Sequence, residues 1–134
     1  MFNFFDKFNN KISGQNDKSL NKEFKLLHLG INQHNKYDAK DLTVLASELF
    51  GMTIEESNSE YLLDGIFEIT KVRGLGKHGH IALGTNDLDK SLRNLSSKGI
   101  ETIKDSEVLD ERGKLKEVYL DTEFGGFAIH LTQI

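Results

Sequence analysis

Hydrophobic residues recur with two different spacings along this 134-residue chain. In residues 24–32 and 79–85 they alternate with small or polar residues, and this period of two predicts β-strands. In residues 39–50 and 88–98 they recur every three or four positions, as in amphipathic helices. Three shorter strand-like runs follow each strand–helix pair. The pattern therefore predicts two modules that share the order strand, helix, strand, strand, strand.

The two modules span residues 24–72 and 78–134, and glycine-rich residues 73–77 link them. Their later strands are predicted at 52–56, 61–63, 66–72, 101–109, 115–121 and 127–133. Residues 110–113 between two of these runs carry a hairpin signal. Because such a unit does not cover its own sheet alone, we predict an α+β fold. The two βαβββ modules would form one curved mixed sheet around a cleft, with the helices outside.

Polar and glycine residues mark the predicted helix ends. Asp38 is expected to cap the first helix and Gly51 to end it. Asn86 or Asp87 is expected to cap the second helix, and Gly99 to end it.

Residues 1–23 are predicted to form an appendage to this domain. Four apolar residues of this segment fall at the spacing of a short amphipathic helix: Phe2, Phe5, Phe8 and Ile12. Residues 13–19 are polar and glycine-containing, so we interpret them as a linker. The helix would dock on the domain or on a second subunit, which makes a homodimer one expectation. The alternative is a partly ordered tail.

Composition narrows the classes of function. The net charge of −4 gives no electrostatic reason to expect nucleic-acid binding. The absence of cysteine excludes disulfides, thiolate metal sites and thiol nucleophiles. We find no signal peptide and no run that would span a membrane, so the expected location is the cytoplasm.

A histidine-bearing strand appears at the start of both modules. The period of two places His28 and His80 on the face of the sheet that the helices do not cover, and Glu68 and His130 fall on the same face of the two closing strands. Three imidazoles and one carboxylate suit a divalent ion. We predict that these four residues hold such an ion, most simply zinc, with nickel, iron, manganese or cobalt as alternatives.

Other polar residues near these strands have two interpretations each. Glu117 and Tyr119 alternate with apolar residues, so they would line the same cavity, and with His130 they are our candidate catalytic residues. Glu117 would otherwise lie on an exposed strand face. His78 shares the face of the ligand strand, but it and His34 are expected at the surface.

The strand sequences resemble those of the vicinal oxygen chelate superfamily, which includes glyoxalase-type lyases, extradiol dioxygenases, acyl-CoA epimerases and bleomycin-type resistance proteins. The resemblance covers about residues 24–133 and rests on the opening strands Leu27-His28-Leu29-Gly30-Ile31 and His80-Ile81-Ala82-Leu83, and on the closing strands Phe67-Glu68-Ile69 and Gly125-Gly126-Phe127-Ala128-Ile129-His130-Leu131. It implies the same four metal ligands. The second half is also similar to the domain that follows the aldolase domain in some bacterial 2-keto-4-hydroxyglutarate/2-keto-3-deoxy-6-phosphogluconate aldolases.

One position departs from the glyoxalase-type pattern. Those members usually have a glutamate where this chain has His130, and that glutamate is both a ligand and a base. The resemblance implies a metal-dependent lyase or isomerase acting on a small 2-oxo or 2-hydroxy acid-like metabolite. The alternative is a non-catalytic binding or regulatory module with a structural metal, related to the accessory domains of sugar-acid aldolases.

Overall fold

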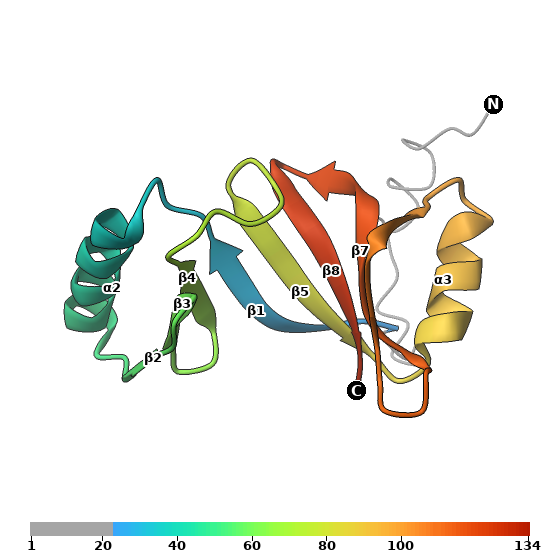
Figure 1. Cartoon of the computed structure of the whole chain (residues 1–134), viewed down its shortest axis with the longest axis horizontal. Helices are drawn as coiled ribbons and strands as arrows, with labels where there is room; N and C mark the ends of the chain where they lie inside the picture. The colour runs from blue at the N-terminus through green and yellow to red at the C-terminus, as the bar shows by residue number, and fades with distance from the viewer. Residues whose placement is uncertain (1–22) are drawn as a thin grey trace, which may run out of the picture.

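The computed structural model describes residues 23–134, which form one eight-stranded mixed sheet and two helices (Figure 1). The strands are β1 (Lys25–Ile31), β2 (Ile54–Glu56), β3 (Glu60–Leu63), β4 (Phe67–Thr70), β5 (Gly79–Thr85), β6 (Thr102–Leu109), β7 (Leu115–Phe124) and β8 (Phe127–Gln133), and the helices are α2 (Lys36–Phe50) and α3 (Leu88–Ser96). This architecture confirms the predicted α+β fold. The amphipathic helix predicted near the N-terminus lies outside the described residues.

The strand order across the sheet is β2-β3-β4-β1-β5-β8-β7-β6. β1 pairs in parallel with β4 and antiparallel with β5, and β5 pairs in parallel with β8. The first and last strands of both halves are therefore four neighbours at the centre of the sheet. These are the strands that carry the predicted metal ligands, so the topology brings residues from distant parts of the sequence together.

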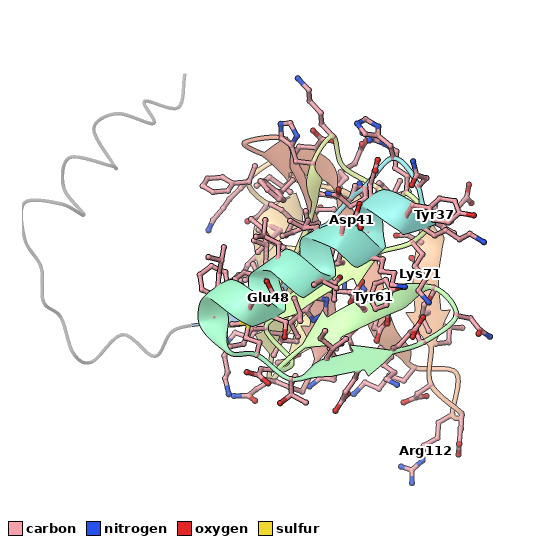
Figure 2. All side chains as sticks on the ribbon, turned by 90° about the vertical axis from the view of Figure 1, so that its left-hand side faces the viewer. Tyr37, Asp41, Glu48, Tyr61, Lys71 and Arg112 are labelled. Atoms are coloured by element: carbon pink, nitrogen blue, oxygen red, sulfur yellow. The ribbon has the colours of Figure 1, made fainter. Side chains whose placement is uncertain are left out.

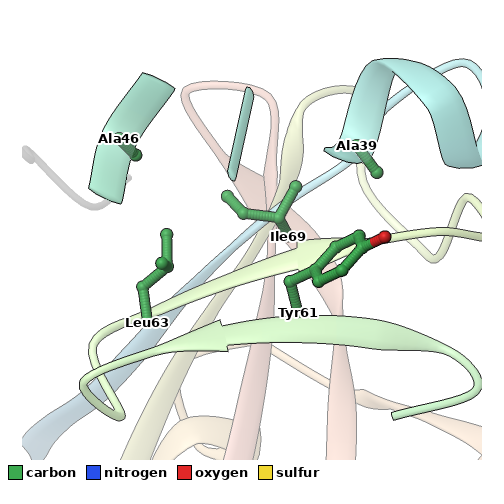
Figure 3. Close-up of a cluster of buried hydrophobic side chains, with 5 residues drawn as sticks. All are labelled: Ala39, Ala46, Tyr61, Leu63 and Ile69. Carbon is green, nitrogen blue, oxygen red and sulfur yellow. The ribbon is translucent and has the colours of Figure 1, made fainter. Parts of the chain in front are cut away.

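Each helix covers its own end of the sheet (Figure 1). Beneath α2 the buried cluster consists of Ala39, Ala46, Tyr61, Leu63 and Ile69 (Figure 3). The second cluster joins α3 to β7 and β8, and consists of Leu88, Val118, Leu120 and Leu131. Because strand side chains alternate between faces, burying these residues turns their sequence neighbours to the opposite face. Neither described helix has the length and apolar character required to cross a membrane.

The helix ends differ in part from the predictions. Asn35, rather than Asp38, caps α2, because its side-chain oxygen accepts hydrogen bonds from the backbone N–H groups of Tyr37 and Asp38, both at 2.9 Å. Gly51 ends α2 in the left-handed conformation, as predicted. In α3 the cap is Asp87, one of the two candidates.

The end of α3 and several strand bounds also differ. Ser97 follows the last residue of α3, while Gly99, at φ 82°, lies beyond it. β7 continues to Phe124, three residues past the predicted end at Asp121. β3 begins at Glu60, one residue earlier than predicted.

Lys71 makes polar contacts with the two outer strands of the first half, β2 and β3. Lys71 Nζ lies 2.7 Å from Glu56 Oε1 and 4.6 Å from the centre of the Tyr61 ring. The charge of Lys71 lowers the pKa of Glu56 through this hydrogen bond. Figure 2 shows this edge below α2, with Asp41 and Glu48 on the helix. Glu56 is exposed at this edge, whereas the Lys71 side chain is largely covered.

Asn32 ties the segment between the two halves to the sheet. Its side-chain nitrogen donates to the carbonyl oxygens of Gly74, Leu75 and Gly76 at 3.2, 3.3 and 3.0 Å. Its side-chain oxygen accepts from the backbone N–H of Gly74 at 3.0 Å and from the Thr70 hydroxyl at 3.2 Å. Because Asn32 is buried, these bonds have little competition from water.

We expect Asn32→Ala to lower the free energy of unfolding by about 2–4 kcal/mol, because it leaves several of these polar groups without partners. Urea denaturation measures the loss. Asn58→Ala, at an exposed position, is the matched control and should change stability little. Equal stability of the two variants would contradict this role for Asn32.

Candidate metal centre

Three of the four predicted ligands meet at one point. His28 Nε2 lies 3.0 Å from His80 Nε2 and 3.1 Å from Glu68 Oε2, and His80 Nε2 lies 3.6 Å from Glu68 Oε1. One ligand atom from each residue lies within 4.8 Å of the others. We call these residues the triad. His130, the fourth predicted ligand, lies outside this group.

Small residues between the triad strands make room for the ligand side chains. In one row across the sheet, Gly30 on β1 lies between Glu68 on β4 and His80 on β5. A Cβ atom on Gly30 would lie 2.1 Å from Cε1 of the His80 ring, so that ring occupies the space above the glycine. In the next row, Ala82 lies between two histidines of β1 and β8. This alternation of large and small residues lets the long side chains converge.

Hydrogen bonds alone do not account for the triad contacts. A neutral imidazole nitrogen carries either one proton or one lone pair. His28 Nε2 has two short contacts, to His80 Nε2 and to a Glu68 oxygen, and only one of them can be a well-formed hydrogen bond. A cation bound between His28 Nε2, His80 Nε2 and a Glu68 carboxylate oxygen would accept a lone pair from each of these atoms at once.

The separations also fit the coordination shell of a small divalent ion. Ligand atoms ~2.1 Å from zinc are ~3.0 Å apart at octahedral angles and ~3.4 Å apart at tetrahedral angles. The two histidine nitrogens are 3.0 Å apart, His28 Nε2 lies 3.1 Å from Glu68 Oε2, and His80 Nε2 lies 3.6 Å from the other carboxylate oxygen, Oε1, so the three side chains approach one another at about these distances. Two imidazoles and one carboxylate are a ligand set used by zinc and by non-haem iron. The residues present therefore fit the predicted metal.

The surroundings of the triad shift the pKa values of Glu68 and His80 in the directions that favour binding of a cation. A hydrogen bond from His28 lowers the pKa of Glu68 against the opposing effect of burial, and the nearby histidines lower it further. Burial lowers the pKa of His80, although the Glu68 carboxylate acts in the opposite direction. At neutral pH the carboxylate is thus ionised and the His80 imidazole is neutral, which are the protonation states that metal binding requires.

His130 pairs with Glu117 beside the triad. Its Nε2 lies 3.5 Å from Glu117 Oε2, and its ring centre lies 6.1 Å from that of His80. The Tyr119 ring packs against His130 at 4.6 Å. Within residues 23–134, His130 Nδ1 is buried without a hydrogen-bond partner. The structure therefore brings the three predicted catalytic residues together at one side of the triad.

Burial is the main cause of the pKa shifts of His130 and Tyr119. It lowers the pKa of His130, with Glu117 opposing the effect, so the imidazole is neutral at pH 7. Burial and the charges of Glu68 and Glu117 raise the pKa of Tyr119, whose hydroxyl stays protonated. A neutral imidazole and a phenol hydroxyl are groups that can accept and donate a proton.

Glu60 is a site residue that the sequence analysis missed. It lies on β3 and shares a face with Leu62, whose register partner is Glu68. Burial, followed by the charge and a hydrogen bond of Glu68, raises the pKa of Glu60. The signal was present in the alternation of Glu60 and Leu62 with buried Tyr61, but the predicted strand began one residue too late.

The remaining histidines lie at the surface, as predicted. His34 and His78 are both exposed, and the His78 ring packs near Phe127 at 5.9 Å. Gly126 leaves space for this ring, because a Cβ atom there would lie 2.6 Å from His78 Cδ2. His78 does not join the triad.

We expect the metal-free protein to lose stability as the pH falls through about 6.5. His80 and His130 have folded-state pKa values below their ordinary 6.5, so the unfolded chain binds protons that the folded chain does not. Stability therefore rises with pH in this range and declines on acidification. Urea denaturation of the metal-stripped protein at about pH 7.5 and about pH 5.5 measures the difference. His130→Gln should show a weaker dependence, and equal wild-type stability at both pH values would contradict the expectation.

The sequence matches no protein-family model and no curated protein. Solved structures do match. A hypothetical protein from Bacillus halodurans is 18% identical with a TM-score of 0.58, and the match covers 84% of this chain and 96% of that protein. For methylmalonyl-CoA epimerase from Mycobacterium tuberculosis the identity is 20%, the TM-score 0.54, and the coverage 81% and 86%. A variant of the Streptomyces coelicolor methylmalonyl-CoA epimerase in complex with 2-nitronate-propionyl-CoA is 18% identical with a TM-score of 0.55. That match covers 81% of this chain and 96% of the epimerase chain.

At these identities the comparison shows the fold. The chain has the α+β fold of these epimerases, the kind of fold that the resemblance of its strand sequences implied. The similarity of its second half to a domain that follows an aldolase domain stays a prediction.

Proposed function

We propose that this protein is a metal-dependent isomerase-type enzyme that moves a proton beside a carbonyl group of a small oxygenated metabolite. The observation that carries the proposal is the meeting of His28, Glu68 and His80 ligand atoms at separations of 3.0 to 3.6 Å. A divalent ion, most simply zinc, would supply Lewis acidity toward the substrate oxygens. Three protein ligands, rather than four, are typical of catalytic zinc sites.

Groups able to transfer protons flank the triad on both sides. Across the sheet, the order is Glu60 on β3, the triad on β4, β1 and β5, and His130 on β8. Neutral His130 can accept a proton, and Glu117 beside it would stabilise the charged imidazolium. Glu60, whose pKa is raised by burial and by Glu68, is a second group that can hold or release a proton. Two such groups suit an isomerase, in which one removes a proton and the other returns one.

His130 therefore fits a base better than a fourth ligand. A metal-bound imidazole would have no free lone pair, whereas in this arrangement His130 is paired with Glu117 outside the triad. This difference favours proton transfer at the position where glyoxalase-type proteins have glutamate. Because His130 is paired with Glu117 and lies outside the triad, we prefer an isomerase or lyase function to that of a binding module with a closed, structural metal site.

The substrate class is tested by proton exchange. Metal-loaded protein is incubated in D₂O with 2-oxo acids, 2-hydroxy acids and methylmalonyl-CoA, the last because the similar epimerases are named for it. NMR should detect metal-dependent deuterium incorporation next to a carbonyl. Glu60→Gln and His130→Gln should each slow the exchange by about 10²-fold or more. His78→Ala, at the surface, is the control and should leave the rate unchanged.

The second candidate is a non-catalytic binding module with a structural metal. The 6.1 Å between the His80 and His130 rings favours it, because a modest movement would bring a fourth nitrogen toward the triad and close the site. In cobalt-substituted protein, a visible spectrum that ignores every tested compound, together with no exchange, would favour this candidate over the enzyme. A regulatory role beside a sugar-acid aldolase, the homodimer and the cytoplasmic location stay predictions.

A further inference from the structure

An apolar groove of about 460 Å³ runs along β1, next to β4 and β5. Besides His28, its lining residues are apolar: Leu26, Leu27, Leu29, Ile66, Phe67 and Ile81. Phe67 also packs against the core cluster beneath α2, so the groove opens beside that helix. A register shift between Leu26 and His28 marks a bulge in β1 at this place.

Large apolar side chains remain exposed around the groove. Leu26 is 62% exposed and Ile66 is 50% exposed. Phe50 at the end of α2 is 62% exposed, and its ring lies 6.3 Å from that of Phe67. Adjacent exposed residues of this size indicate a surface that another apolar segment covers.

The segment that precedes β1 has the composition to cover this surface. Its four apolar residues at helical spacing are Phe2, Phe5, Phe8 and Ile12. Residues 1–22 contain four lysines and two aspartates, a net charge of +2, which leaves −6 on the rest of the chain. Apolar residues at the spacing of one helix face, and a net charge opposite to that of the rest of the chain, therefore match the segment to the folded domain.

The length of the segment also permits this contact. β1 begins at Lys25, next to Leu26 of the groove. Residues 13–22 extended would span ~33 Å, and a strand as long as β1 spans ~23 Å. The predicted helix can thus fold back along the whole of β1. Because the connection is short, the effective concentration of the segment favours the groove of its own chain over that of a second copy.

We propose that residues 1–12 form an amphipathic helix that packs its phenylalanines into the groove along β1 of the same chain. The helix would be a third helical cover on the sheet, beside α2. It would shield Leu26 and Ile66 from water, and would support the strand that carries His28.

The cysteine-free sequence allows a direct test by disulfide formation. Phe8→Cys is combined with Ile66→Cys in the groove, or with Leu109→Cys on β6 at the far edge of the sheet, where the leucine is 55% exposed. In glutathione redox buffers, the groove pair should form an intramolecular disulfide at an effective concentration at least about tenfold above that of the control pair. Equal effective concentrations would overturn the proposal. Disulfide-linked dimers formed by the groove pair would also overturn it, and would assign the groove to a second copy.

Thermal unfolding of the full chain gives an independent measurement. Phe5→Ser should lower Tm by about 5 °C, because it removes a docked aromatic side chain. Asn10→Ser, in the same segment, is the control and should leave Tm unchanged. An unchanged Tm for Phe5→Ser would contradict docking.

Discussion

His80→Ala is expected to abolish tight binding of divalent metal ions. His80 contacts both other members of the triad, at 3.0 Å to His28 and 3.6 Å to Glu68. Loss of residues that only support metal ligands costs 10–100-fold in affinity, so loss of a ligand should cost about 100-fold or more. Titration of the metal-stripped protein with zinc against a chromogenic chelator measures the effect.

Metal binding should also be visible in thermal stability. At a free metal concentration of about 100 times Kd, the wild-type protein should gain ~2.7 kcal/mol, a rise in Tm of about 10 °C for a domain of this size. His80→Ala should lose this rise. His78→Ala removes an exposed histidine two residues earlier and is the matched control. If both variants bind metal as the wild type does, the triad is not the metal site.

Gly30→Ala is expected to disrupt the metal centre without removing any ligand. The added methyl group would lie 2.1 Å from Cε1 and 2.3 Å from Nδ1 of His80, so the ring must move. We expect a loss of about 1–3 kcal/mol in the free energy of unfolding from overpacking. The displaced ring should also weaken metal binding by about 10–100-fold, comparable to losing a supporting residue. Urea denaturation and zinc titration measure the two effects.

Gly74→Ala is the matched control for this substitution. An added Cβ atom there would come no closer than 3.8 Å to another residue, the Asn32 side-chain oxygen. It should therefore change neither stability nor metal affinity substantially. If Gly30→Ala behaves in the same way, the His80 ring does not occupy the space that the structure assigns to it.

The sequence predicted the fold because the local signals are strong. The period-two runs around His28 and His80 and the helical spacing between 39 and 50 each give one element, and Gly51 ends the first helix as expected. The Asn35 cap was missed because Asp38 has a similar preference for this position, and local propensity does not distinguish them. Treating the two halves as repeats predicted one mixed sheet, whereas the order of its strands came from the structure.

The strand period alone determined which face His28, Glu68, His80 and His130 share, because side chains alternate with a period of two whatever the strands pack against. Only the tertiary structure decided which of them meet. Sequence spacing does not encode the distances between strands, so the separation of His130 from the triad, its pairing with Glu117, and the approach of Glu60 to Glu68 depend on register, sheet curvature and the space left above Gly30.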